Sequence, residues 1–191
     1  EAYVAEAVLN KYKMILDCAR GTQKDRDECS AALRTAVAVE PLAMDVSAAK
    51  ARAADAANKH VPLSEVEHAQ ERIAVAEQKQ GAKTQAEATL TAQLALRSLE
   101  VDVSAAKVSV EEAVAAHASQ PLIERAKQHY RKARSDQKRR DAATATLAAA
   151  VAAAPLDMDV TSAEAAAAEA EAAGVSAAVV AGAREQIGTA A

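Results

Sequence analysis

The feature that most constrains this chain is a segment that occurs three times at a constant spacing. Its copies, residues 41–61, 98–118 and 155–175, align without a gap, and each begins 57 residues after the previous one. The same offset relates apolar residues on either side, which are Leu33, Leu90 and Leu147 upstream and Val66, Ile123 and Val180 downstream. A fixed period of this length is typical of repeat proteins, in which stacked units bury a continuous core.

Each copy predicts three helices separated by two breaks. Pro41 and Pro155 end the first helix near Val39 and Ala153, and the matching helix of the middle copy ends near Ala95. The second helix is short and rich in Ala, with expected ends at His60, His117 and Gly174, and the third opens at Pro62, Pro121 and Ser176. Apolar residues spaced 3-4-3 along the third helix give it one buried face, as at Val66, Ala69, Ile73 and Ala76.

The third helix of one copy is expected to continue into the first helix of the next, because no Pro separates them. From Leu63 to about Arg97 this gives a helix of about 50 Å, with Gly81 as a weak point. The predicted fold class is all-α, with tandem three-helix repeats joined by long linker helices in an elongated array. The expected domains are residues 1–27 (the third helix of a truncated preceding repeat plus a linker), 28–84 (repeat 1), 85–141 (repeat 2) and 142–191 (repeat 3).

Composition predicts a thin core and a soluble chain. Phe and Trp are absent, Tyr occurs three times, and Ala dominates the apolar residues, so large core side chains are few. The formal net charge is −4, no stretch is long and apolar enough to span a membrane, and the N-terminus lacks a signal-like pattern. Cys18 and Cys29 would lie about 16 Å apart on one helix, too far to pair. Two unpaired thiols favour an intracellular location, cytoplasmic or cytoskeletal.

The recurring Asp45, Asp102 and Asp159 stand before the second helix of each copy. Either these carboxylates or the hydroxyls two residues later are suited to accept an N–H from the first helical turn. A calcium loop needs more oxygen ligands within a dozen residues, and usually a Gly, than these segments supply. Helix capping is therefore the interpretation we adopt.

The histidines are also interpreted structurally. His60 and His117 share one position of the repeat, where the third copy has Gly174, and we expect the imidazole to satisfy carbonyls at the helix end. A metal site is disfavoured because no Cys lies nearby, and His68 and His129 are expected on the surface. No phosphate loop, nucleophile elbow or Cys–His pairing is present, so we expect no enzyme, cofactor or small-molecule substrate.

One stretch of the chain carries more positive charge than a solvated helix needs. Residues 124–140 contain eight basic residues and two acidic ones, whereas the chain from Pro155 onward is acidic. The structural interpretation is a solvated linker helix. The functional one is a docking surface for an acidic protein tail, an anionic lipid surface or nucleic acid, formed by Arg131, Lys132, Arg134, Lys138, Arg139 and Arg140. Reading of nucleic-acid bases is disfavoured, since Tyr130 alone offers a stacking ring.

In topology, these three-helix units resemble spectrin-like repeats, although each unit is about half as long and lacks the Trp that usually anchors their cores. Ala-rich helical repeats of this appearance also occur in very large cytoskeletal and ciliary proteins of algae. The resemblance implies a structural or scaffolding segment, a spacer or tether in a cytoskeletal or axonemal assembly. The alternative is an adaptor that uses the basic helix. Self-association stays open, because the apolar stripes could be completed by another chain, and an ice-binding surface is disfavoured because Thr is scattered.

Overall fold

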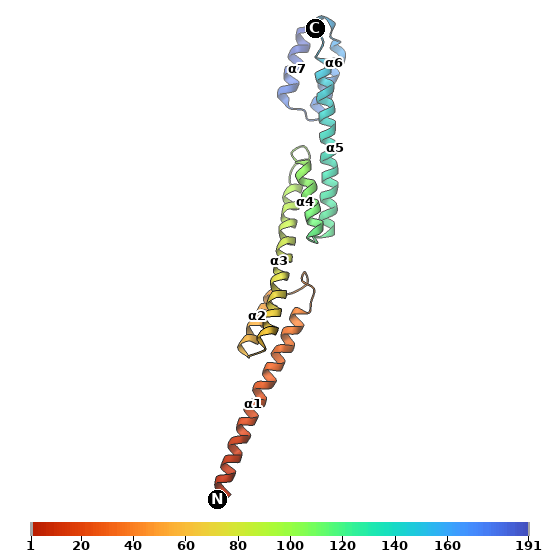
Figure 1. The fold of residues 1–191 in the computed structure, drawn as a ribbon. Coiled ribbons are helices and arrows are strands. Elements are labelled where there is room, and N and C mark those ends of the chain that lie inside the picture. The colour runs from red at the N-terminus through yellow and green to blue at the C-terminus, as the bar shows by residue number, and fades with distance from the viewer. Residues whose placement is uncertain (1, 191) are drawn as a thin grey trace. The chain divides into compact units, whose positions relative to one another are not determined.

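The computed structural model describes the backbone of residues 2–190 and the side chains of residues 8–154 and 156–190. Across these residues, every regular element is helical, which confirms the expected all-α class. In chain order (Figure 1) the elements are α1 (Ala2–Val37), α2 (Val46–Asn58), α3 (Leu63–Leu94), α4 (Val103–Ala115), α5 (Gln120–Ala150), the 3-10 turn η1 (Pro155–Asp157), α6 (Val160–Ala172) and α7 (Ala177–Ala190).

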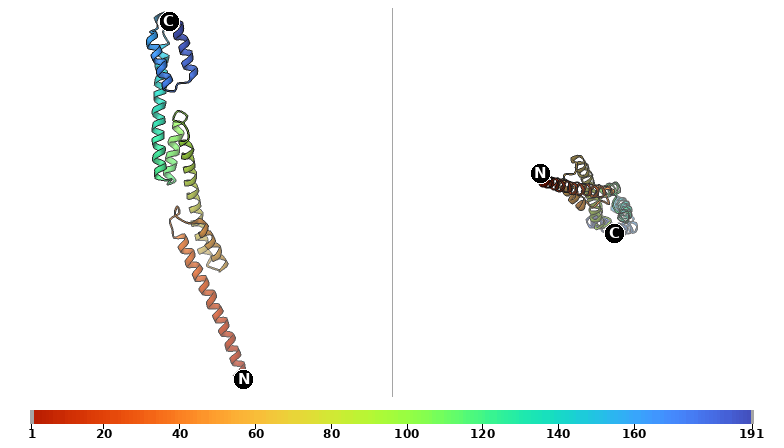
Figure 2. Two further views of the ribbon diagram at one scale, coloured as in Figure 1. Left: turned by 180° about the vertical axis from the view of Figure 1, so that it is seen from behind. Right: turned by 90° about the horizontal axis from the view of Figure 1, so that it is seen from below.

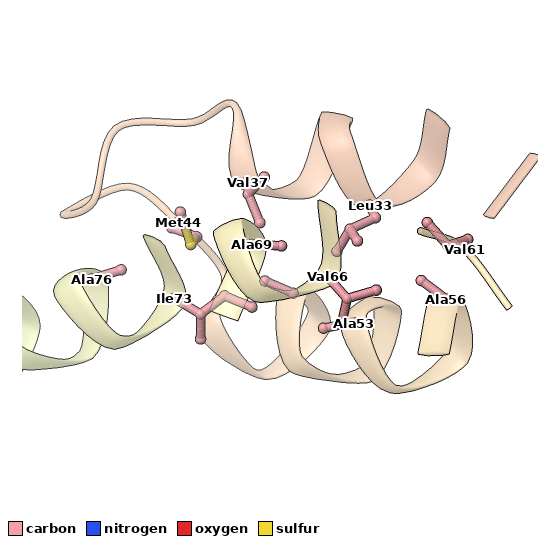
Figure 3. Packing of buried hydrophobic residues seen from close by; sticks show 11 residues of the cluster. Leu33, Val37, Met44, Ala53, Ala56, Val61, Val66, Ala69, Ile73 and Ala76 are labelled. Atoms are coloured by element: carbon pink, nitrogen blue, oxygen red, sulfur yellow. The ribbon is translucent and has the colours of Figure 1, made fainter. Parts of the chain in front are cut away.

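The chain forms two compact units, Glu1–Thr84 and Gln85–Ala191. In the first unit, α1, α2 and α3 pack around one apolar cluster, which we call the first bundle (Figure 3). Leu33 of α1 is fully buried there and lies near Val66 of α3, with Ala53 and Ala56 of α2 close to both. Within this bundle, Glu65 ties α3 to α1 by accepting hydrogen bonds from Ser30 (2.6 Å) and Arg34 (2.7 Å). These bonds lower the pKa of Glu65, and the bond from Arg34 has the largest effect.

The second unit holds three further clusters that include residues of α5, and the larger two form the second and third bundles. In the second bundle, Leu90 of α3 packs with Ala113 of α4 and Ile123 of α5. In the third, Leu147 of α5 packs with α6 and α7, which fold back along the C-terminal part of α5 (Figure 2). The helix α5 therefore supplies buried residues to both bundles. The largest fully buried side chains of the described residues are Leu33, Leu90 and Leu147, one per bundle.

An aspartate begins each of the short helices α2, α4 and α6. Asp45 accepts a hydrogen bond from the amide of Ala48 at 2.9 Å, and Asp102 accepts one from Ser104 at 2.8 Å. Asp159 accepts from both the hydroxyl (2.7 Å) and the amide of Ser162, and these bonds lower its pKa. Of the two capping candidates predicted from the sequence, the carboxylate is the one that caps.

A left-handed residue ends each of these short helices. His60 and His117 have φ of 58° and 55°, and Gly174 has φ of 76°. In each turn the left-handed residue and the next one donate their amides back to the helix, as when His117 donates to Val114 and Ala118 donates to Ala113. This is the Schellman pattern. The helices end two residues earlier than expected, at Asn58, Ala115 and Ala172.

His60 and His117 lie at helix ends as expected, but the expected reason for their presence there was wrong. The backbone, rather than an imidazole bonded to carbonyls, defines the position, which explains why Gly replaces His in the third turn. A Cβ at Gly174 would lie 2.5 Å from Cδ1 of Leu99, so a side chain there would require Leu99 to shift. The turn after α6 therefore lies next to Leu99 of the turn before α4.

Replacing Leu90 by Ala should lower the free energy of unfolding by about 2 to 5 kcal/mol, because the thin core around it has few large side chains to close the cavity. Urea denaturation followed by circular dichroism measures this. Leu63→Ala is the matched control, since Leu63 is 71% exposed and should change stability little. Equal effects of the two substitutions would contradict the assignment of Leu90 as a core residue.

Replacing His117 by Gly should leave stability unchanged or raise it by up to about 1 kcal/mol, because Gly adopts a positive φ without the cost of a Cβ. His117→Ala keeps that cost and should be the less stable variant. Thermal unfolding of the two variants makes the comparison. If both lose stability equally, the imidazole itself is required at this helix end, as the sequence first suggested.

Candidate partner-binding surface

The predicted docking residues lie on α5, whose opposite face is buried. Five residues of α5 form that buried face, namely Ile123, Ala126, Ala133, Ala143 and Leu147. Arg131, Lys132, Arg134, Lys138 and Arg139 are exposed, whereas Arg140 is half-buried. The basic stretch is thus the solvent face of a helix that already packs against α4 and α6.

Helical geometry separates five of the six predicted residues into two lines, and the half-buried Arg140 lies on neither. At about 100° per residue, Arg131, Arg134 and Lys138 fall with Lys127 in a sector of about 60° that extends for about 16 Å along α5. Lys132 and Arg139 lie roughly 100° away around the helix, on the side of Arg125. We call these the outer line (Lys127, Arg131, Arg134, Lys138) and the inner line (Arg125, Lys132, Arg139). The sequence prediction of one docking patch is therefore too coarse.

These cations have few intramolecular partners. Among the described side chains, the ion pairs of the molecule include none of the six predicted residues. In the outer line, only Lys127 is paired, with Glu124 at 2.9 Å, and this contact lowers the pKa of Glu124. By contrast, Arg34 and Arg184 are held by carboxylates of neighbouring helices. The positive charge of α5 is left available to solvent or to a ligand.

A cavity of about 550 Å3 lies beside the inner line, where the turn between α3 and α4 meets α5. The turn contributes residues 96–100, and α5 contributes His129 and Lys132. Ser98 donates its hydroxyl to Asp136 of α5 at 2.6 Å, which fixes the turn against the helix. Nε2 of His129 is buried without a hydrogen-bond partner, whereas the residue as a whole, expected on the surface, is half-buried. His68 is exposed, as expected.

Sequence reasoning did not find this cavity, although a signal existed. The turns at the matching positions of the other two bundles contain Glu40–Pro41 and Ala154–Pro155, whereas this turn contains Arg97–Ser98. The middle copy thus has Ser98 where the other two copies have a rigid Pro, and it has the cation Arg97 directly before that serine. Both changes fall next to the most basic part of the chain.

A second surface feature lies on α1, outside the bundles. Val8, Leu9, Tyr12, Ile15 and Leu16 are exposed, and helical geometry places them on one face of about 120°. A groove of about 600 Å3 continues this face past Leu16 and Ala19 toward Ala31. An exposed apolar stripe of this kind typically marks a contact with another chain or segment.

The described residues contain no group of three or more His, Cys, Asp or Glu side chains placed to hold a metal ion. Nor does any helix in the described part of the chain have the length and apolar character that crossing a membrane requires. Comparison with protein-family models, with curated proteins and with solved structures gives no match for this chain. Any proposal about function therefore depends on the geometry of the chain itself.

The two cysteines differ in environment. Cys18 is exposed, whereas Cys29 is half-buried and its Sγ donates to Oδ2 of Asp55 at 3.4 Å. Burial, followed by the Asp55 carboxylate, raises the pKa of Cys29.

Iodoacetamide should therefore alkylate Cys18 faster than Cys29 in the native chain at pH 8, because Cys29 is both less accessible and less ionised. Peptide mass spectrometry over a time course measures the two rates. An Asp55→Asn substitution should speed the reaction of Cys29 and leave Cys18 unchanged. Equal rates at the two thiols in the unsubstituted chain would contradict the described environment of Cys29.

Proposed function

We propose that this chain is a structural segment of tandem three-helix repeats that serves as a spacer or tether in a larger assembly, of the cytoskeletal or axonemal kind. The observation that carries the proposal is the sharing of helices between cores. Ile123 and Ala126 of α5 belong to the second bundle, and Ala143 and Leu147 of the same helix belong to the third. Repeat proteins gain stability from such coupling between neighbours.

The positions of the short helices support a period of 57 residues. The helices α2, α4 and α6 each contain 13 residues, and they begin at Val46, Val103 and Val160, which are 57 residues apart. The buried positions follow the same offset, as in Ala49, Ala106 and Ala163 or Ala56, Ala113 and Ala170. A period kept by both the sequence and the buried side chains favours a tandem array over three unrelated helical hairpins.

The unbroken helices α3 and α5 are well suited to act as linkers. They contain 32 and 31 residues, so each is about 47 Å long at the standard rise. Small Ala side chains dominate the cores, which lets helix axes approach closely. A segment built in this way is suited to hold its two ends a fixed distance apart and is poorly suited to enclose a substrate. We accordingly propose a non-enzymatic role.

The second candidate function is an adaptor for an anionic partner, and the unpaired cations of α5 favour it. A spacer that also carries a docking site combines both functions without conflict. The resemblance to spectrin-like and Ala-rich cytoskeletal repeats is consistent with either role.

Small-angle X-ray scattering with light scattering tests the spacer proposal. A compact chain of 191 residues would have a radius of gyration of about 16 Å, and we expect a clearly larger value for a monomer. Gly81→Pro should alter the scattering profile by breaking α3, whereas Gly81→Ala should preserve it. The Ala side chain fits, because nothing lies within 4 Å of the position of a Cβ at Gly81. A radius near 16 Å would contradict the proposal.

A further inference from the structure

We propose that the exposed apolar face of α1 binds a helical hairpin of this repeat type that belongs to a second molecule. Such a hairpin consists of the end of a long helix, a turn and a short helix capped by Asp, as α1 and α2 form in the first bundle. The inference rests on the proposed tandem-repeat spacer and names the partner that joins it to a larger assembly. Its support comes from the register of the face, a glutamine within it and two residues on its flanks.

The apolar face of α1 matches the buried face of α3 position by position. Four residues of α1 stand 57 residues before four buried residues of α3, pairing Leu9 with Val66, Tyr12 with Ala69, Leu16 with Ile73 and Ala19 with Ala76. In the first bundle the four α3 residues are at most 4% exposed, whereas Leu9 and Leu16 are 58% and 54% exposed. Because the two helices carry the same stripe, the same kind of hairpin is suited to cover both. Tyr12 is larger than its counterpart, so small side chains such as Ala are needed opposite it.

A glutamine extends the same face at one position of the repeat, as Gln23, Gln80 and Gln137. In the first bundle, Nε2 of Gln80 donates to the carbonyl oxygens of Pro41 (2.9 Å) and Met44 (2.8 Å) in the turn between α1 and α2. Gln23 is exposed, lines the groove of about 600 Å3 on α1, and donates only to Asp27 one turn away, at 3.1 Å. A contact of this kind within one exposed helix contributes little. The amide of Gln23 is therefore suited to bind the turn carbonyls of a hairpin that docks on α1.

Arg20 determines the charge that the short helix of the partner carries. It stands at the position of Glu77 in α3, whose carboxylate pairs with Lys50 of α2. Because the charge at this position is reversed, a hairpin with an acid in place of Lys50 complements α1. The third copy has such an acid, Glu164. Arg20 itself contacts only Asp17, at 3.7 Å with both side chains at least 75% exposed, and such a pair is weak.

Val8, on the other flank, favours the same hairpin. It stands at the position of Glu65, which accepts a hydrogen bond from Arg34 in the first bundle. A hairpin with an Arg at that place would press an unpaired guanidinium against Val8. The third copy has Ala148 there, so its hairpin, residues 142–175, has the side chains that both flanks of α1 require. The partner is therefore a hairpin with an apolar residue and an acid at these two positions.

The test titrates a fluorescently labelled peptide of residues 142–175 with the full chain and follows the anisotropy. We expect saturable binding of this peptide. A peptide of residues 28–61, the hairpin of the first copy, is the matched probe. It should bind more weakly, because it brings a cation to each flank.

Two substitutions in α1 locate the binding face. Leu16→Asp should weaken binding at least about tenfold, because it places a charge in the apolar contact. Met14→Asp is the matched control and should change the affinity less than about twofold, since Met14 is 76% exposed and lies on the opposite face of α1. Gln23→Ala should weaken binding about fivefold and leave the thermal stability of the chain alone unchanged.

A charge exchange isolates the contact of Arg20. Glu164→Lys in the peptide should weaken binding about threefold, and Arg20→Glu in the chain should restore it. A peptide that binds without saturation, or equally to the Leu16→Asp and Met14→Asp variants, would overturn the proposal. So would self-association of the chain alone that Leu16→Asp abolishes, because the face would then be covered by a second copy of α1. Scattering by the chain alone tests the spacer, so either proposal can fail without the other.

Discussion

The burial of one leucine per bundle is the interaction on which the rest of the structure depends. Among the side chains that the structure describes, Leu33, Leu90 and Leu147 are the largest fully buried ones, and each is surrounded mainly by Ala, Val and Ile. Cores this thin bury little apolar area for each helix, so an isolated bundle would gain little beyond the entropy that it loses. In the proposed array, a long helix shared between two cores would compensate, because each core would then stabilise a helix that also serves its neighbour.

The turns around the short helices keep this arrangement in register. An aspartate cap fixes where α2, α4 and α6 begin, and a left-handed residue fixes where they end. The helix is therefore held at 13 residues in every bundle, although its outward-facing residues differ. Because these turns hold the bundles in register, the exposed residues of the bundles can differ from one repeat to the next. The basic exposed face of α5 is an example.

Much of this fold could be predicted from the sequence, because a period is visible without any knowledge of contacts. The offset of 57 residues locates the buried Leu, Val and Ala positions, and the recurring Asp locates the helix starts. The role of His60 and His117 was not predictable in the same way, since a side-chain explanation and a backbone explanation both fit a residue at a helix end. The appearance of Gly174 at the third position favoured the backbone explanation.

The candidate site was harder to predict, because it depends on which face of α5 each cation occupies and on a turn distant in sequence. Counting charges along the sequence grouped six residues, but the helix places five of them on two separate lines and Arg140 on neither. The contribution of Leu96, Leu99 and His129 required the packing of the α3–α4 turn against α5, which no local pattern encodes.

The central claim is that continuous helices couple neighbouring cores, and native-state hydrogen exchange tests it most directly. We predict that amides at residues 77–88 of α3 and 134–142 of α5 exchange nearly as slowly as the flanking amides that lie within the bundles. Exchange at these junctions at the rate of an unstructured chain, with protection kept only on either side, would show that the bundles are independent and would contradict the account.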